Sequence, residues 1–272
     1  MAVSHYVLTG WAVLSAFFAV LWAFQARSRD ASHVDVGWAL GLGFMSVLAA
    51  VSLPGDAGRR ALAAAMTCLW SLRLAGHLYV DRVRGKPEDG RYAALRARWG
   101  KAANRNFFFF FQAQALLDVL LSLPFVAVSS RSGALGGLDA AGAAIFLVSV
   151  AAEAAADRQL ARFRRDPQSR GKTCRAGLWA WSRHPNYFFE WTHWLSYAVM
   201  APGDWRAWIA PPAMLFFLLK VTGIPATEAQ ALKSRGEDYR RYQRETSMFF
   251  PWFPRRRAAS GVSAPPRGAG GP

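Results

Sequence analysis

The sequence of 272 residues has few cysteines and few patterns that are typical of metal or nucleotide sites. Its two cysteines, Cys68 and Cys174, are too few for a disulfide framework or a cysteine-rich metal site. No His-x-x-x-His pair occurs among the five histidines, so we predict no metal site. A strand-associated Gly-x-Gly-x-x-Gly turn and a phosphate-binding loop are also missing, so arginine, lysine and helix ends must hold any nucleotide.

Acidic residues are scarce as well, because 17 Asp and Glu stand against 33 Lys and Arg, which gives a net charge of +16. The basic residues gather in a few segments, and the runs between them are almost uncharged. No compact basic domain or nucleic-acid motif occurs, so we expect no nucleic-acid partner. Hydrophobic residues make up 53% of the chain, with 12 Trp and 19 Phe, and this composition predicts a membrane protein.

Seven apolar runs predict membrane-spanning helices. The fifth run continues past the membrane surface as the alanine-rich string AAEAAADRQLARFRR. In the second run, Gly37, Gly41 and Gly43 let another helix approach closely. We therefore predict an all-α, polytopic membrane protein with about seven transmembrane helices. The runs cover residues 6–24, 34–53, 61–80, 107–129, 138 onward, 187–200 and 208–224.

The basic residues fall on one side of this predicted bundle. Heavy clusters lie between the third and fourth runs, between the fifth and sixth, and after the seventh. The positive-inside rule then places the N-terminus outside and the C-terminus in the cytoplasm. Arg27 and Arg29 follow the first run and no basic residue precedes it, which is the reverse of a signal peptide. The loops on the other side carry only Arg59, Arg60, Arg131 and Arg206.

The domain organisation follows from the same pattern. Residues 1–254 form one transmembrane domain, and its C-terminal half, about 138–254, holds the candidate cofactor site. Residues 255–272 are rich in Pro, Gly, Ala and Arg, so we expect a disordered tail. No internal repeat is visible, which gives no support to an inverted-repeat transporter.

Ionisable residues inside the apolar runs form stripes along helical faces. Such residues are costly in lipid and usually face a bundle interior or an aqueous cavity. Spacings of three and four residues place the members of each stripe on one face. We predict that the stripes converge on a cavity that opens to a soluble anionic cofactor and to a lipid-dissolved substrate. The alternative is a set of helix-packing salt bridges, such as Arg73 with Glu190. The stripes are Trp70, Arg73, His77 and Asp81; Glu153, Asp157, Leu160 and Arg164; and Asn186, Glu190, His193 and Tyr197.

The string CRAGLWAWSRHPNYFFE, residues 174–190, leads a basic and aromatic loop into the sixth run. Arg183, His184 and Asn186 can donate hydrogen bonds to phosphate, ribose or amide oxygens. Pro185 suits the first turn of a helix, where its missing N–H costs nothing. Glu190 follows Asn186 by four residues and shares its face. The alternative is a positive-inside loop that anchors helix ends.

Five strings together resemble the steroid 5-alpha-reductase-related family, in its bacterial, DUF1295-like branch of uncharacterised membrane proteins. They are DVGW, LWSLRLAGHL, EAAADRQLARFRR, SRHPNYFFEW and GEDYRRYQRETSMFFPWF, and the resemblance extends over residues 35–254. It implies a seven-helix bundle in the bacterial inner membrane, with NADPH in its cytoplasmic half. The implied reaction is reduction of an activated carbon–carbon double bond in a lipid, sterol or isoprenoid-like substrate.

The resemblance also implies residue roles. Asn186 and Glu190 match the family's cofactor-binding asparagine and glutamate, while Glu153 stands where the steroid enzymes have asparagine. We assign catalysis to Asp35 as the acid, with Arg73 and Glu190 as partners; a cap of the second helix is the alternative for Asp35. The full set implied for NADPH is Glu153, Asp157, Arg164, Arg175, Arg183, His184, Asn186, Tyr187, Glu190, Glu228 and Tyr239.

Other functions remain open at this point. Trp70 replaces the tyrosine that polarises a steroid ketone, and this change argues against a steroid substrate. Isoprenylcysteine carboxyl methyltransferases share a similar Arg-His-Pro-x-Tyr string and a downstream glutamate, but they use S-adenosylmethionine. The alternative function is therefore a methyltransferase of a membrane lipid or prenylated thiol, and a third class is a non-enzymatic lipid-binding or scaffold protein. In every case we expect membrane lipids and a lipid-soluble small molecule as partners.

Overall fold

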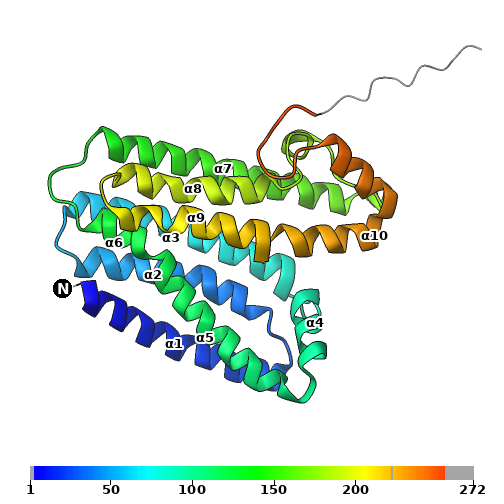
Figure 1. Cartoon of the computed structure of the whole chain (residues 1–272), viewed down its shortest axis with the longest axis horizontal. Coiled ribbons are helices and arrows are strands. Elements are labelled where there is room, and N and C mark those ends of the chain that lie inside the picture. The colour runs from blue at the N-terminus through cyan, green and yellow to red at the C-terminus, as the bar shows by residue number, and fades with distance from the viewer. Residues whose placement is uncertain (1–2, 222, 255–272) are drawn as a thin grey trace, which may run out of the picture.

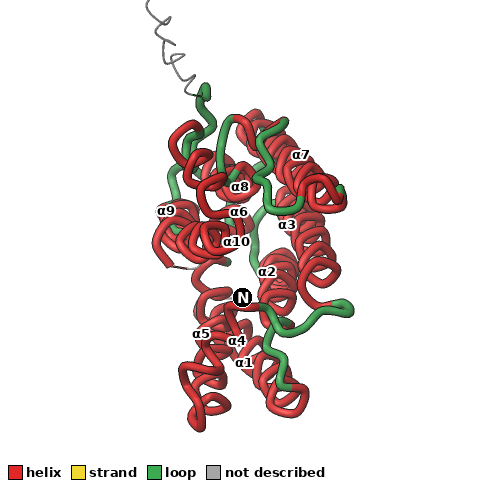
Figure 2. Tube along the Cα trace, turned by 90° about the vertical axis from the view of Figure 1, so that its right-hand side faces the viewer, coloured by secondary structure: helices red, strands yellow, loops and turns green. Residues whose placement is uncertain are grey.

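The computed structural model describes residues 3–221 and 223–254, and within these ranges all regular elements are helical (Figure 2). This confirms the predicted all-α class. The long helices lie side by side in a bundle, and short elements gather at its two ends (Figure 1). The predicted disordered tail, residues 255–272, lies outside the described residues. The main helices of the bundle are α1 (Val3–Ser28), α2 (His33–Ser52), α3 (Ala57–Leu78), α5 (Ala103–Leu121), α7 (Gly137–Arg165), α8 (Pro185–Met200) and α9 (Ala210–Phe216).

Six helical segments of the described chain are long and apolar enough to cross a membrane, as expected of an integral membrane protein. The sixth predicted run, residues 187–200, is helical as α8, but α8 has 16 residues. At 1.5 Å per residue it spans about 24 Å, which is shorter than a hydrocarbon core of about 30 Å. Because of its length, α8 is not among the six segments that can cross a membrane. The six segments are Val3–Ser28, His33–Ser52, Ala57–Val83, Gly90–Ser129, Gly137–Arg165 and Trp205–Glu245.

The predicted helix over residues 107–129 is divided in the structure. It begins earlier, at Ala103, and is interrupted between α5 and the short, buried α6 (Leu123–Ser129). Pro124 lacks an N–H and its ring crowds the preceding turn, so the helix cannot continue unchanged. The Ser122 hydroxyl donates a hydrogen bond of 2.8 Å to the Val119 carbonyl at the break. The chain therefore changes direction at Ser122.

Two helices form within segments that the sequence presents only as polar and basic. One is α4 (Gly90–Trp99), whose first turn is capped because the Asp89 carboxylate accepts a hydrogen bond from the Arg91 N–H at 2.9 Å. The other is α10 (Ile224–Glu245), which bends at Gly236, where φ is +51°. Positive φ strongly favours glycine. The bend lets the second half of α10 return to the loop before α8, where the Tyr242 hydroxyl donates to the Trp179 carbonyl.

Close packing of α2 depends on its glycines, as the sequence predicts. A Cβ atom at Gly41 would clash with the Asp118 carboxylate of α5, and one at Gly43 would lie 2.6 Å from the Ser71 hydroxyl oxygen of α3. Helix α2 thus contacts α3 and α5 through its backbone. This close packing keeps α3, which carries part of the candidate site, in the middle of the bundle.

A buried ion pair closes the end of the bundle where α3 and α7 begin. Arg59 Nε donates to Asp139 Oδ1 at 2.8 Å, and both side chains are 3% exposed. Arg59 Nη1 also donates to the carbonyls of Arg131 and Gly133, and Nη2 donates to the carbonyl of Ala134. One guanidinium therefore fixes the loop between α6 and α7.

Candidate functional site

Helices α3, α7 and α8 bring a group of ionisable side chains together inside the bundle. Arg73 of α3 forms an ion pair with Glu153 of α7, and its Nη1 lies 3.2 Å from Asp157 Oδ2. Glu190 of α8 lies within electrostatic reach of Arg73, and its carboxyl faces that of Glu153. All three carboxylates are buried. We call Arg73, Glu153, Asp157 and Glu190 the buried cluster.

The first turns of α8 complete this cluster. Pro185 is the first helical residue, so its missing N–H removes no helical hydrogen bond. At the next residue, Asn186 Nδ2 donates to Asp157 Oδ1 at 3.2 Å. Glu190 accepts hydrogen bonds from the indole N–H groups of Trp70, at 2.8 Å, and Trp194, at 3.4 Å. Trp70 of α3 thus binds Glu190 of α8.

His193 lies one turn deeper and, like Trp70 and Trp194, is not among the predicted catalytic or cofactor-binding residues. It is 1% exposed, and its ring lies 4.8 Å from the rings of Trp70 and Trp194. Its Nδ1 is 3.9 Å from Glu190 Oε2. The sequence contains a signal for this contact, because Glu190 and His193 have Glu-x-x-His spacing and share the α8 stripe.

Several buried polar atoms around the cluster have no hydrogen-bond partner among the described residues. They include Arg73 Nε, Asn186 Oδ1 and His193 Nε2. The great majority of buried polar atoms in proteins are hydrogen-bonded, to protein or to ordered water. One donor, one acceptor and an imidazole nitrogen therefore remain for a ligand that offers both kinds of group.

Asp35 lies elsewhere, and the structure does not bring it together with Arg73 and Glu190 as we predicted. Its carboxylate accepts hydrogen bonds from Arg82 at 2.8 Å, from Arg91 at 2.6 Å and from the Tyr92 hydroxyl at 2.5 Å. Arg82 follows Arg73 by nine residues, or about 13 Å along the helix. These contacts fasten α4 to the start of α2. The alternative role for Asp35, a helix cap, also differs from what is observed, since Ser32 occupies the cap position.

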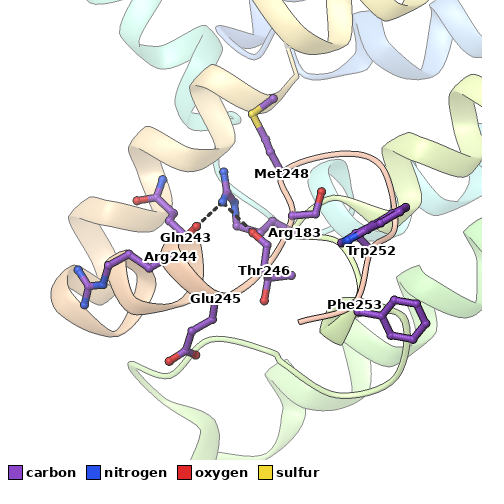
Figure 3. Close-up of a pocket in the computed structure, with 9 residues that line it drawn as sticks. Arg183, Gln243, Arg244, Glu245, Thr246, Met248, Trp252 and Phe253 are labelled. Atoms are coloured by element: carbon purple, nitrogen blue, oxygen red, sulfur yellow. Dashed lines mark hydrogen bonds between the residues drawn. The ribbon is translucent and has the colours of Figure 1, made fainter. Parts of the chain in front are cut away.

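Arg183, His184, Glu228 and Tyr239 form a second network, between the loop before α8 and α10. Arg183 Nε donates to Glu228 Oε1 at 2.8 Å, and its Nη1 donates to the carbonyls of Gln243 and Thr246 (Figure 3). The Tyr239 hydroxyl and His184 Nε2 both lie 3.3 Å from Glu228 Oε1. Burial lowers the pKa of the His184 imidazole. These side chains hold α10 in place and are apart from the buried cluster.

The other residues predicted to bind the cofactor differ in how many contacts they make within the protein. Arg175 donates to Glu245 at 2.8 Å and to Asp238 at 3.0 Å, and the Tyr187 hydroxyl lies 3.2 Å from the Thr227 hydroxyl. Arg164 near the end of α7 is instead 60% exposed at its side chain, with Asp81 3.8 Å away. Arg164 and Arg235 lie close enough to repel each other. Arg164 is exposed and Arg235 is half-buried over the Tyr239 ring, and together they form a positively charged pair.

These observations define a polytopic helical membrane protein with a polar, charged site inside its bundle. The chain matches the model of a family described as "Protein of unknown function (DUF1295)" over residues 21–246. It therefore belongs to this family. No curated protein and no solved structure matches the chain.

Proposed function

We propose that the protein is a membrane-embedded reductase that uses NADPH to reduce an activated carbon–carbon double bond in a lipid-soluble substrate. The observation that carries this proposal is the set of unpartnered atoms at the buried cluster. A nicotinamide carboxamide has an NH₂ group for Asn186 Oδ1 and a carbonyl oxygen for Arg73 Nε. The steroid-reductase resemblance of Asn186 and Glu190 agrees with this fit.

The positively charged pair Arg164 and Arg235 supports binding of the phosphates. Arg164 follows Asp157 by seven residues on α7, a rise of about 10 Å, so an extended dinucleotide can contact both ends of this stretch. A guanidinium suits phosphate because it offers several N–H donors in a planar fork. When bound there, NADPH supplies the hydride, and the residues of this chain hold and orient it.

Glu190 and His193 provide the polar groups on the deeper, membrane side of Asn186. The side chains of Trp70, Trp194 and Phe146 surround His193 and exclude water from it. A substrate that enters from the bilayer would meet these groups first. We therefore assign orientation of the substrate's polar end to Glu190 and His193, and not to Asp35.

The test is a thermal-shift series on the purified protein in detergent, with NADPH and S-adenosylmethionine as ligands. NADPH is expected to stabilise the wild type, and Arg164→Ala to weaken its binding by about tenfold or more, because a charge-assisted hydrogen bond contributes about 1.5–3 kcal/mol. Arg162→Ala is the matched control, since Arg162 is also exposed and lies two residues away on α7.

Two results would contradict the proposal. One is stabilisation by S-adenosylmethionine alone, which would favour the methyltransferase alternative, since that cofactor has no phosphate. The other is NADPH binding that Arg164→Ala leaves unchanged. If neither ligand changes the unfolding temperature, the result instead favours a non-enzymatic lipid-binding protein.

Arg183→Ala is expected to act differently from Arg164→Ala. Arg183 is mostly buried, and its removal leaves Glu228 without the guanidinium and the carbonyls of Gln243 and Thr246 without their donor. We expect a loss of about 1–3 kcal/mol in unfolding free energy without ligand, together with faster proteolysis of α10. If the unliganded variant is as stable as the wild type and only its affinity for NADPH falls, this prediction is wrong and Arg183 binds a phosphate of NADPH.

A further inference from the structure

The last described residues, 246–254, form a segment that we call the C-terminal strap, at the margin of the bundle beside the loop that precedes α8 (Figure 1). Two main-chain hydrogen bonds hold it there. The Arg183 N–H donates to the Ser247 carbonyl at 2.8 Å, and the Trp252 N–H donates to the Trp181 carbonyl at 2.9 Å. Phe249 is buried against Phe188 and Trp191 of α8. The strap is therefore a fixed part of the fold.

Large apolar side chains of the strap are nevertheless exposed together. Phe250 contacts Phe188 and Trp191, which lie in the first two turns of α8, where the chain enters the apolar bundle. Aromatic residues at this level are typical of the membrane–water interface. A group of exposed aromatics on one surface also marks an interaction site more often than single ones do. The exposed fractions are 41% for Met248, 55% for Phe250, 69% for Trp252, 70% for Phe253 and 42% for Trp181.

A pocket of about 400 Å³ lies between the strap and the end of α10 (Figure 3). One side is polar, with Arg183, Arg244 and the Thr246 and Ser247 segment, and Trp252 and Phe253 provide an apolar side. The Glu245 carboxylate also lines the pocket, but it already pairs with Arg175 and Arg241. Arg244 pairs with Glu237 at 2.8 Å, but both side chains are more than 60% exposed. Such exposed pairs contribute little, so the Arg244 guanidinium is available to another anion.

The sequence that contains the end of α10 and the strap is strongly basic. Residues 233–257 contain eight Lys and Arg against three Asp and Glu, a net charge of +5. Arg255, Arg256 and Arg257 follow the strap directly in sequence. Basic residues beside an interfacial aromatic segment are the combination that attracts acidic lipid headgroups.

We propose that the C-terminal strap and its pocket bind the headgroup of an anionic phospholipid. The exposed aromatics insert into the interface, and Arg244 and the polar side of the pocket receive the lipid phosphate. A zwitterionic lipid offers the same phosphate together with a cationic group, so the basic surroundings favour it less. This inference is independent of the proposed reductase activity, since none of the buried cluster takes part.

The test uses the full chain in lipid nanodiscs that contain brominated phosphatidylglycerol or, in a separate sample, brominated phosphatidylcholine. Bromine quenches nearby tryptophan, and the difference between wild type and Trp252→Phe isolates the signal of Trp252. We expect stronger quenching of Trp252 by the glycerol lipid at equal bromine content. Arg244→Gln is expected to lower this preference by about fivefold, since one basic residue near an anionic surface contributes about 1 kcal/mol.

Trp205 provides a matched control, because it is 71% exposed and lies at the opposite end of α8. Its signal, isolated with Trp205→Phe, should show no preference between the two lipids. Equal quenching of Trp252 by both lipids would overturn the proposal, as would a preference that Arg244→Gln leaves intact. A site for free phosphate would be shown by an equal rise in unfolding temperature with inorganic phosphate and with phosphatidylglycerol, and this result would also overturn the proposal.

Discussion

Replacing Arg59 with methionine is expected to lower the free energy of unfolding by about 3–5 kcal/mol, because Asp139 is then left buried without its cation. The pair is almost inaccessible to solvent, and the same guanidinium donates to carbonyls of the loop between α6 and α7. Those carbonyls lose their donor too, which adds to the cost. Chemical or thermal unfolding in detergent measures the effect.

Two further variants make the Arg59 prediction specific. Arg241→Met removes an arginine from an exposed ion pair with Glu245 and should cost less than about 1 kcal/mol. Adding Asp139→Leu to Arg59→Met removes the stranded carboxylate and should recover part of the loss. Equal losses for Arg59→Met and Arg241→Met would show that burial of the pair has no energetic consequence.

Replacing Arg73 with methionine is expected to have an effect of similar size, about 3–5 kcal/mol, for a different reason. Arg73 contacts Glu153 and Asp157 and lies within electrostatic reach of Glu190, so its loss leaves three neighbouring buried carboxylates with their mutual repulsion. The variant should also lose NADPH stabilisation, since Arg73 Nε is the donor that we assign to the carboxamide.

The Arg73 prediction is tested by a double-mutant cycle. Glu153→Gln in the Arg73→Met background should restore part of the stability, because it removes one of the opposed charges. His77→Phe is the control, since His77 lies one turn along α3, is partly exposed and stands 3.8 Å from Asp157. A cycle without coupling between Arg73 and Glu153 would refute the charge balance that we infer.

Much of the helical fold is predictable because lipid requires long apolar runs, and such runs are visible in a single sequence. The prediction is less accurate where other forces form the helix. Helix α4 and the end of α10 depend on contacts with distant residues, such as Tyr92 with Asp35 and Tyr242 with Trp179. The break at Ser122 has a sequence signal in Pro124, although the apolar run continues on both sides of it.

The candidate site shows the same division. Spacings of three and four residues place Arg73, Glu153 and Glu190 on helical faces, and the structure brings those faces together. Nothing local in the sequence indicates that Arg82 and Arg91 fold onto Asp35. The hydrogen bonds that Arg183 makes at the end of α10 likewise depend on the bend at Gly236, which turns this end towards Arg183. Roles that rest on helix periodicity were therefore easier to anticipate than roles that rest on the path of a polar segment.

The distance in sequence between Arg183 and its partners has a consequence for how the protein is made. Glu228 follows Arg183 by 45 residues and Thr246 by 63. At a synthesis rate of about 5–20 residues per second, the last of these partners appears roughly 3–13 s after Arg183. During that interval the loop before α8 has no α10 to hold it. This end of the bundle is thus completed last, after the apolar segments have been synthesised, and a chain that stops before residue 246 never completes it.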